Sequence, residues 1–396
     1  MAQILSGIRV LDLTRVASGP WCTQLLADMG ATVIKVERPG GGDDSRSFRP
    51  SVEGADQLSA FFLALNRGKQ SITIDIATPE GAELVRELAA NCDVLVENYK
   101  AQALVKYGLD YESVRAVSPE IVYCSITGFG QTGPSAQRPA YDSILQATAG
   151  HMSLCGDPEG EPMRTAINIT DLTTGYLAAV AVLGALFHRL RTGEGQFIDA
   201  AMLDASIALT AQYASGFLTG GEVAIRAGNR APNTFPSGVF TAGDGDMIIV
   251  CGNDRQFRAL AAAVGRPELA GDARFATNRA RREHHPELTL ILNEALSART
   301  LAQWSALLEE AGVPSSGINA IDQVFTDPQV IHRGIRVEVE QDDGRVLPIV
   351  RSPLNFSKTP ATNGPTPALG AHTDAVLRAL GRNDSEIAAL RARGVI

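Results

Sequence analysis

The sequence predicts an α/β protein with a Rossmann-like large domain and a small α+β domain, on three observations. Its 396 residues are more than one ordinary core holds, so two or three domains are expected. Short β-branched runs alternate with helical patterns through about the first two hundred residues, which is typical of a parallel sheet covered by helices. After a Gly-, Asn- and Pro-containing stretch at Gly228–Asn233, a hairpin pattern leads into helices.

The N-terminal pattern supplies the elements of the large domain. Runs rich in Val, Ile and Thr predict strands at Ile8–Leu13, Thr32–Glu37, Ser71–Ile76, Asp93–Glu97 and Ile121–Ile126. Apolar residues at helical spacing predict helices at Pro20–Met29, Thr78–Asn91 and Tyr111–Val117, with a further helix near Phe197–Leu218.

The second half of the chain changes character. Two runs around a Gly/Asp turn predict a hairpin within Gly238–Val250. Helices are expected at Phe257–Val264, Pro286–Leu296, Leu301–Glu310 and Asp384–Arg393, and strands at Arg336–Glu340 and Val346–Val350. The predicted organisation is a large domain at 1–200, a linker at 201–228, a small domain at 229–325 and a C-terminal segment at 326–396 that returns to the large domain.

Composition excludes several classes of protein. Apolar residues make up 45% and charged residues 20% of the chain, which argues against disorder. The formal net charge of -9 argues against a nucleic-acid or membrane-surface binder, so an anionic ligand would need a local basic pocket. The N-terminus has no secretory pattern, and the apolar run Gly175–Phe187 is short for a bilayer, so we expect a cytoplasmic protein. Five scattered cysteines indicate no metal site.

The segment Gly128–Gly133 reads GxGxxG directly after a predicted strand. A dinucleotide fingerprint needs a helix to begin there, with its N-terminus aimed at the pyrophosphate. Pro134 and Ser135 follow instead, so the loop continues. We interpret the motif as a coincidence, not as a nicotinamide site.

Asp171 is the most informative residue. It lies in Asn168-Ile169-Thr170-Asp171-Leu172-Thr173-Thr174-Gly175, directly before a long apolar helix. A carboxylate at a helix start can be a nucleophile, or it can cap the helix by accepting hydrogen bonds from free backbone N–H groups. The residue pattern alone favours the cap.

Short motifs lie in a specific order and spacing along nearly the whole chain. They are Gly7-Ile8-Arg9-Val10-Leu11-Asp12, Gly19-Pro20 with Thr23 and Gln24, Gly30-Ala31 to Glu37-Arg38, Asn66-Arg67-Gly68-Lys69, Val96-Glu97-Asn98-Tyr99, Gly128 to Pro134, Tyr141-Asp142, Asp171 and Gly193-Glu194-Gly195-Gln196. Together these motifs resemble the class III CoA-transferases, the family that includes formyl-CoA transferase and carnitine CoA-transferase and is similar to α-methylacyl-CoA racemase. The resemblance implies an interlocked homodimer with the active site between the chains.

The resemblance also implies a catalytic role for Asp171. A carboxylate can attack an acyl-CoA thioester to form an aspartyl mixed anhydride, with CoA and acyl-CoA as substrates and with no metal or further cofactor. The residues that the resemblance places along CoA or at the mouth of the site are Val16, Ala17, Arg38, Asn66, Arg67, Lys69, Asn98, Tyr99, Lys106, Arg138, Tyr141 and Asp142.

Two departures from the family's sequence pattern narrow the range of expected reactions. Ala17 stands where formyl-CoA transferase has a glutamine, which disfavours formyl or oxalyl transfer. Ala140-Tyr141-Asp142 stands where the racemases have Gly-His-Asp, and a racemase needs that acid/base pair. His151 is nearby but is interpreted as an ordinary helix residue.

The expected reaction is CoA transfer from succinyl-CoA to a small carboxylic acid, such as the dicarboxylates itaconate, citramalate or mesaconate. Arg46, Arg49 and Arg226 are candidates to bind the second carboxylate. A 2-methylacyl-CoA racemase and a non-catalytic acyl-CoA-binding protein are the alternatives.

Overall fold

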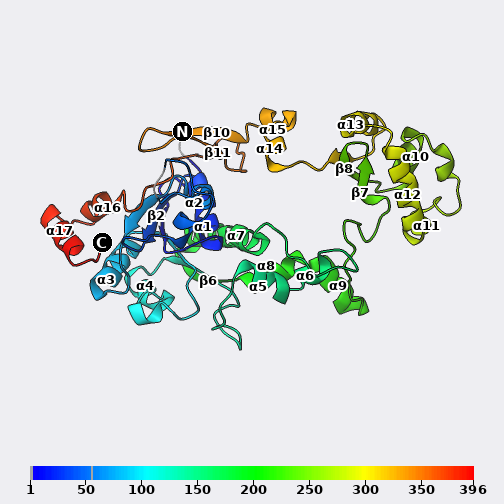
Figure 1. The fold of residues 1–396 in the computed structure, drawn as a ribbon. Helices are drawn as coiled ribbons and strands as arrows, with labels where there is room; N and C mark the ends of the chain where they lie inside the picture. The colour runs from blue at the N-terminus through cyan, green and yellow to red at the C-terminus, as the bar shows by residue number, and fades with distance from the viewer. Residues whose placement is uncertain (1–2, 55–56) are drawn as a thin grey trace. The chain divides into compact units, whose positions relative to one another are not determined.

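The computed structural model describes residues 3–54 and 57–396, which form two compact units (Figure 1). The first comprises the described residues up to His151, together with Thr165–Gly220 and Arg333–Ile396. The second comprises Met152–Arg164 and Gly221–His332.

A parallel sheet of six strands forms the centre of the first unit, in the order β3-β2-β1-β4-β5-β6. The inner strands are buried along almost their whole length, because helices cover both faces of the sheet, and buried polar residues such as Asp12, Lys35 and Glu97 interrupt their apolar runs. The six strands are β1 (Arg9–Asp12), β2 (Thr32–Glu37), β3 (Gln70–Thr73), β4 (Val94–Glu97), β5 (Val122–Thr127) and β6 (Gln196–Ala201).

Each face of the sheet has its own apolar core. One core lies under α3 (Pro79–Ala89), α4 (Tyr111–Val117), α16 (Thr373–Ala379) and α17 (Asp384–Ala392). The other lies under α1 (Ser18–Asp28), α5 (Asp142–Thr148), α7 (Ile169–Thr192) and the start of α8 (Met202–Leu209). The C-terminal helices α16 and α17 therefore complete the core of the N-terminal sheet.

The remaining elements of the first unit lie outside these cores. They are α2 (Ala60–Asn66), α9 (Ala211–Gly220) and the antiparallel pair β10 (Arg336–Glu340) and β11 (Val346–Val350), whose bounds match the predicted strands. The short helix α6 (His151–Leu154) begins in the first unit at the buried His151, whose Nε2 lies 2.7 Å from the Ser206 carbonyl oxygen, and its remaining residues belong to the second unit.

The second unit is a small α+β fold. The predicted hairpin is present as β7 (Ser237–Ala242) and β8 (Gly245–Val250), with β9 (Ser315–Gly317) added beside β8. Apolar side chains of the hairpin and helices form one core around Phe257. The helices of this unit are α10 (Asp254–Ala263), α11 (Asn278–Glu283), α12 (His285–Leu296), α13 (Leu301–Glu310), α14 (Ile321–Val324) and α15 (Pro328–His332).

The segment around Phe197 differs from its sequence-based prediction. A helix was expected to begin there, but Gln196–Ala201 forms the edge strand β6, which pairs with β5. The edge of the sheet supplies backbone hydrogen bonds that local propensity does not report. The expected linker at 201–228 contains α8 and α9, which belong to the first unit. No helix follows the GxGxxG segment within residues 128–141, which agrees with the interpretation that this segment is not a dinucleotide-binding motif.

The long helix α7 is apolar enough, by length and composition alone, to cross a membrane. One of its faces packs in the core through Ala178, Val182 and Ala185, as in the central helices of globular proteins. Its other face leaves large apolar side chains exposed, among them Val180 and Leu190.

Candidate functional site

Asp171 is the third residue of α7, whose N-cap is Asn168, so Asp171 does not cap its own helix. Asp142 supplies that cap from α5. One carboxylate oxygen of Asp142 accepts hydrogen bonds from the N–H groups of Thr170 and Asp171, at 2.9 and 3.2 Å. The other accepts from Gln146 Nε2 at 2.5 Å. Because these free N–H groups are satisfied by Asp142, the side chain of Asp171 is available for another role.

The environment of Asp171 raises its pKa to about 7. Burial contributes most, because a charged carboxylate loses solvation, and the neighbouring Asp142 adds repulsion. Hydrogen bonds from the hydroxyl and the backbone N–H of Ser18 act in the opposite direction by stabilising the carboxylate. A carboxylate with a pKa near neutrality is a stronger nucleophile than an ordinary one, and perturbed groups of this kind are typical of active sites.

Ser18 reaches Asp171 because α1 and α7 approach closely. Gly175 is the contact point: a Cβ atom there would lie 2.7 Å from the Ser18 carbonyl oxygen and 2.9 Å from Trp21 Cδ1. Only glycine permits this separation between the helices. Ser18 is the first residue of α1 and lies two residues before the predicted helix start at Pro20, and it was not among the residues selected from the sequence.

Enlarging residue 175 should push the two helices apart. We expect Gly175→Ala to lower the free energy of unfolding by about 1–3 kcal/mol, as overpacking commonly does. Gly175→Ser should cost more because its side chain is larger. Urea denaturation of the three chains measures this. Equal stability of all three would contradict the close approach.

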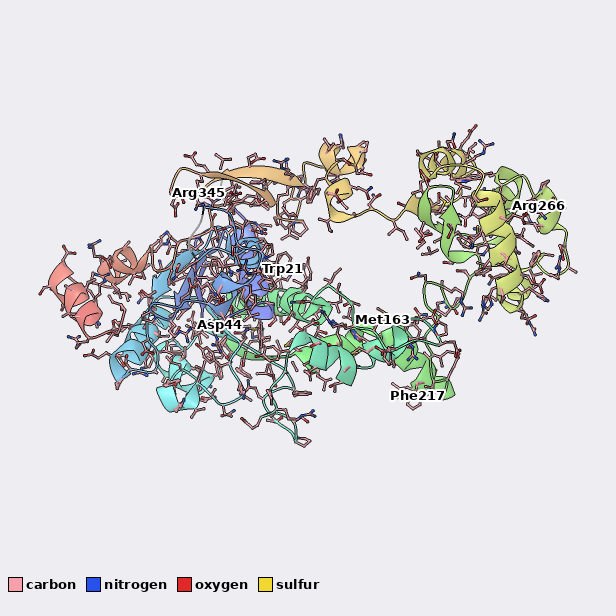
Figure 2. The ribbon with its side chains drawn as sticks, viewed as in Figure 1. Trp21, Asp44, Met163, Phe217, Arg266 and Arg345 are labelled. Carbon is pink, nitrogen blue, oxygen red and sulfur yellow. The ribbon has the colours of Figure 1, made fainter. Side chains whose placement is uncertain are left out.

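Asp171 lines a cavity of about 260 Å³ at the carboxyl ends of the strands. A second cavity, of about 220 Å³, shares Arg15 and Tyr99 with the first. Asp44, labelled in Figure 2, also lines the first cavity. We call these the acyl cavity and the nucleotide cavity, after the parts of an acyl-CoA that the resemblance stated above predicts for their lining residues.

Most of the residues selected from the sequence lie along these cavities. Those lining the acyl cavity are Val16, Ala17, Asn98, Tyr99, Arg138, Tyr141 and Asp171, and those lining the nucleotide cavity are Arg38, Tyr99 and Lys106. Sequence reasoning did not select Arg15, Lys100 or the segment Ile74–Ile76 after β3, which also line them. Cations and carboxylates line the cavities together: the cations are Arg15, Lys35, Arg38, Lys100, Lys106 and Arg138, and the acidic residues are Glu37, Asp43, Asp44, Asp75 and Asp171.

Asn66, Arg67 and Lys69 lie in a buried network and line neither cavity. Lys69 Nζ donates to Asp12, Thr23, Asn66 and the Pro20 carbonyl oxygen at 2.8–3.1 Å, and burial lowers its pKa to about 8. Arg67 pairs with the buried Asp28 at 2.7 Å. The side chains of Asn66, Arg67 and Lys69 thus connect α1, α2 and the sheet through hydrogen bonds and ion pairs.

The arginines considered for a second carboxylate also lie elsewhere. Arg46 is buried and makes a bidentate pair with Glu37, with both N···O distances 2.7 Å, so its guanidinium is already occupied. Arg226 belongs to the second unit and donates to the carbonyl oxygens of Asp157 and Gly160. Arg49 lines neither cavity. Within residues 3–54 and 57–396, the cations that share a cavity with Asp171 are Arg15, Lys100 and Arg138.

Within the described residues, no three His, Cys, Asp or Glu side chains are grouped so that they could hold a metal ion. The chemistry that the acyl cavity itself offers is that of a carboxylate, two donors from Ser18 and a set of cations. Such a set suits acyl transfer with anionic substrates.

Comparison with known proteins agrees with this chemistry. A succinate–glutarate CoA-transferase of Agrobacterium fabrum is 46% identical over 381 residues, which are 95% of each chain. The human succinyl-CoA:glutarate CoA-transferase is 39% identical over 394 residues, covering 99% of this chain and 90% of that one. The crystal structure of a CAIB/BAIF family protein from Brucella suis has a TM-score of 0.88 at 43% identity, covering 96% of this chain and 100% of that chain. The family model of CoA-transferase family III matches residues 5–373, and this chain belongs to that family of enzymes.

Proposed function

We propose that this enzyme transfers CoA from succinyl-CoA to a small dicarboxylate, with glutarate the first acceptor to test. The observation that carries the proposal is Asp171, a carboxylate of raised pKa in a cavity that also holds three cations. The relatives named above act on succinate or succinyl-CoA and glutarate, which supports this donor and acceptor.

The reaction would proceed through covalent intermediates on Asp171. An oxygen of the carboxylate attacks the thioester carbon, the C–S bond breaks, and CoA leaves as the thiolate. The thiolate then attacks the aspartyl carbonyl, which releases succinate and leaves an aspartyl-CoA thioester. The acceptor carboxylate and the thiolate repeat the two steps in turn, so the new thioester forms and the Asp171 carboxylate returns.

Ser18 would stabilise the charge that develops in these steps. The side chain and backbone of Ser18 already stabilise the charged Asp171 carboxyl. When the thiolate or the acceptor attacks the aspartyl carbonyl, negative charge develops on the Asp171 oxygen, and donors fixed before the reaction stabilise such an oxyanion without reorganisation.

CoA would extend from the nucleotide cavity to the acyl cavity along Arg15 and Tyr99. Arg38 and Lys106 suit its phosphates, since an exposed lysine acts as a point charge and arginine can form paired hydrogen bonds. We expect Lys106→Ala to raise KM for succinyl-CoA about tenfold while kcat stays close to that of the wild type. Initial rates over a range of succinyl-CoA concentrations check this, and an unchanged KM would place the phosphates elsewhere.

The acceptor's second carboxylate would meet Arg15, Lys100 or Arg138, the cations that line the acyl cavity. This replaces the assignment to Arg46, whose charge is neutralised by Glu37.

The architecture would be a Rossmann-like unit that functions as a homodimer in the cytoplasm. The strand order is that of doubly wound sheets, whose ligands bind at the carboxyl ends where the order reverses, here between β1 and β4. The exposed apolar face of α7, including Val180 and Leu190, would be covered by a second copy rather than by lipid. Light scattering on the purified chain should give twice the mass of 41.9 kDa.

Mass spectrometry of CoA thioesters tests the reaction. The enzyme would be incubated in deuterated water with succinyl-CoA, 2-methylacyl-CoA and a panel of mono- and dicarboxylic acids. We expect glutaryl-CoA or another dicarboxylyl-CoA to form as succinate is released. Deuterium entering 2-methylacyl-CoA without a new thioester would instead show a racemase, and binding without either change would show a non-catalytic protein.

A further inference from the structure

The loop that joins β1 to α1 holds Val16 in an unfavourable backbone conformation. The φ angle of Val16 is +67°, in the left-handed region that a β-branched side chain rarely occupies. Of the three non-glycine residues with positive φ in the described part of the chain, Val16 is the one that lines the acyl cavity. Strained backbone of this kind persists where surrounding contacts enforce it, and it is typical of functional sites.

The side chain of Asp43 stabilises the conformation of Val16 by accepting its backbone N–H. Both of its carboxylate oxygens lie 3.2 Å from the Val16 nitrogen and accept its N–H. Asp43 is 1% exposed and forms a buried ion pair with Lys35 at 2.9 Å. Ser45 adds donors from its N–H and its hydroxyl to Asp43, at 2.9 and 2.7 Å. The Lys35 charge and these hydrogen bonds hold the pKa of Asp43 well below its usual range, although burial opposes them.

Neighbouring strands hold the rest of the loop. Lys35 Nζ donates to the Thr14 carbonyl oxygen at 2.8 Å. The Asn98 side chain accepts from the Arg15 N–H and donates to the Arg15 carbonyl oxygen, both at 2.8 Å. The loop is therefore fixed on one side by β2 and on the other by the turn after β4.

Two residues after Val16, the loop ends at Ser18, which lies so close to α7 that a Cβ atom at Gly175 would be 2.7 Å from its carbonyl oxygen, and the side chain and backbone of Ser18 stabilise the charged form of Asp171. A shift of Val16 would carry these donors away from the Asp171 carboxyl, because only Ala17 separates the two residues. Asp43 itself does not touch the reacting atoms. It acts through the backbone of Val16.

We propose that Asp43 is a positioning residue for the transfer reaction, which holds the strained Val16 so that Ser18 points its two donors at Asp171. The inference rests on the proposed function for its kinetic consequence, but the alignment of Ser18 with Asp171 can be measured without turnover.

The test is Asp43→Asn, which keeps the size of the side chain and removes its charge. We expect kcat at pH 7 to fall at least about tenfold, with a smaller change in KM for succinyl-CoA. The carboxyl of Asp171, followed by ¹³C NMR in aspartate-labelled protein and assigned with Asp171→Asn, should titrate at a higher pH, because Ser18 no longer stabilises its charge. The charged or titratable groups around Asp171 are Asp142 at the start of α7 and, in the acyl cavity, Arg15, Asp44, Tyr99, Lys100, Arg138 and Tyr141, and none of these is changed.

Asp28→Asn is the matched control. Asp28 is 1% exposed and paired with Arg67, as Asp43 is with Lys35, but no hydrogen bond joins its carboxylate to the loop at Val16. The Asp28→Asn variant should be less stable than the wild type, but the pH at which Asp171 titrates should be unchanged. A folded Asp43→Asn chain with unchanged kcat and an unchanged Asp171 titration would overturn the proposal.

Val16→Gly covers the case in which Asp43→Asn does not fold. Glycine accepts the positive φ without strain, so this chain should fold and Asp43→Asn should be tolerated in its background. In that background we expect Asp43→Asn to change kcat and the Asp171 titration less than in the wild type, and fully additive effects would contradict the coupling. A wild type that exchanges no CoA would refute the proposed function, while the NMR titration would still decide the role of Asp43.

Discussion

Asp171→Ala should lose CoA transfer by at least about 10³-fold in kcat while it still binds succinyl-CoA. Removing a covalent nucleophile leaves only the rate that positioning and hydrogen-bond donors supply. Binding should persist, because the cations along the proposed CoA path, Arg38 and Lys106 among them, are unchanged. Formation of glutaryl-CoA from succinyl-CoA and labelled glutarate, followed by mass spectrometry, measures the loss, and calorimetry measures the binding.

Asp204→Ala is the control for this substitution. Asp204 is also the third residue of a helix, α8, and it is exposed and lines neither cavity. It should keep the wild-type rate. Residual exchange in Asp171→Ala within about tenfold of the wild type would show that the covalent route is not used.

The pH dependence of kcat/KM should show a midpoint near 7. The pKa of Asp171 is about 7 because of burial and the repulsion of Asp142, and only the ionised form attacks the thioester. Below this midpoint the rate should fall about tenfold per pH unit. An ordinary aspartate would stay ionised down to about pH 4, so a flat profile between pH 5 and 8 would contradict the assignment.

Asp142→Asn tests the cause of this shift. The amide keeps an acceptor for the N–H of Thr170 but carries no charge, so the midpoint should move to lower pH. At pH 5 the variant should then retain a larger fraction of its maximal rate than the wild type does. A midpoint that stays near 7 would assign the raised pKa to burial alone.

The same pKa has a consequence for stability. Because the pKa of Asp171 in the folded state is raised above that of an ordinary aspartate, ionisation disfavours the folded state, and the free energy of unfolding declines as pH rises between about 4 and 7. The difference in free energy of unfolding between Asp171→Asn and the wild type should therefore favour the variant more at pH 8 than at pH 4. Urea denaturation at the two pH values provides the measurement.

Much of the fold was predictable because its elements carry local signals. The inner strands are β-branched runs buried on both faces, and the helix at Leu301–Glu310 and the strands at Arg336–Glu340 and Val346–Val350 have the predicted bounds. The strand at Gln196–Ala201 was not predictable, because its hydrogen bonds come from β5, some seventy residues earlier in the sequence.

The sequence by itself determined the family and the candidate nucleophile, since the order of its motifs and the place of Asp171 are properties of the chain. Only the tertiary structure decided what surrounds that carboxylate. Ser18 and Asp142 are distant from Asp171 in sequence and reach it only because α1 and α5 pack at the start of α7. Folding likewise buries Lys69 among Asp12 and Thr23 and leaves Lys106 exposed, although both lysines were selected from the sequence as cations for the same ligand. Burial and contact depend on how distant segments pack, and a local pattern does not contain that information.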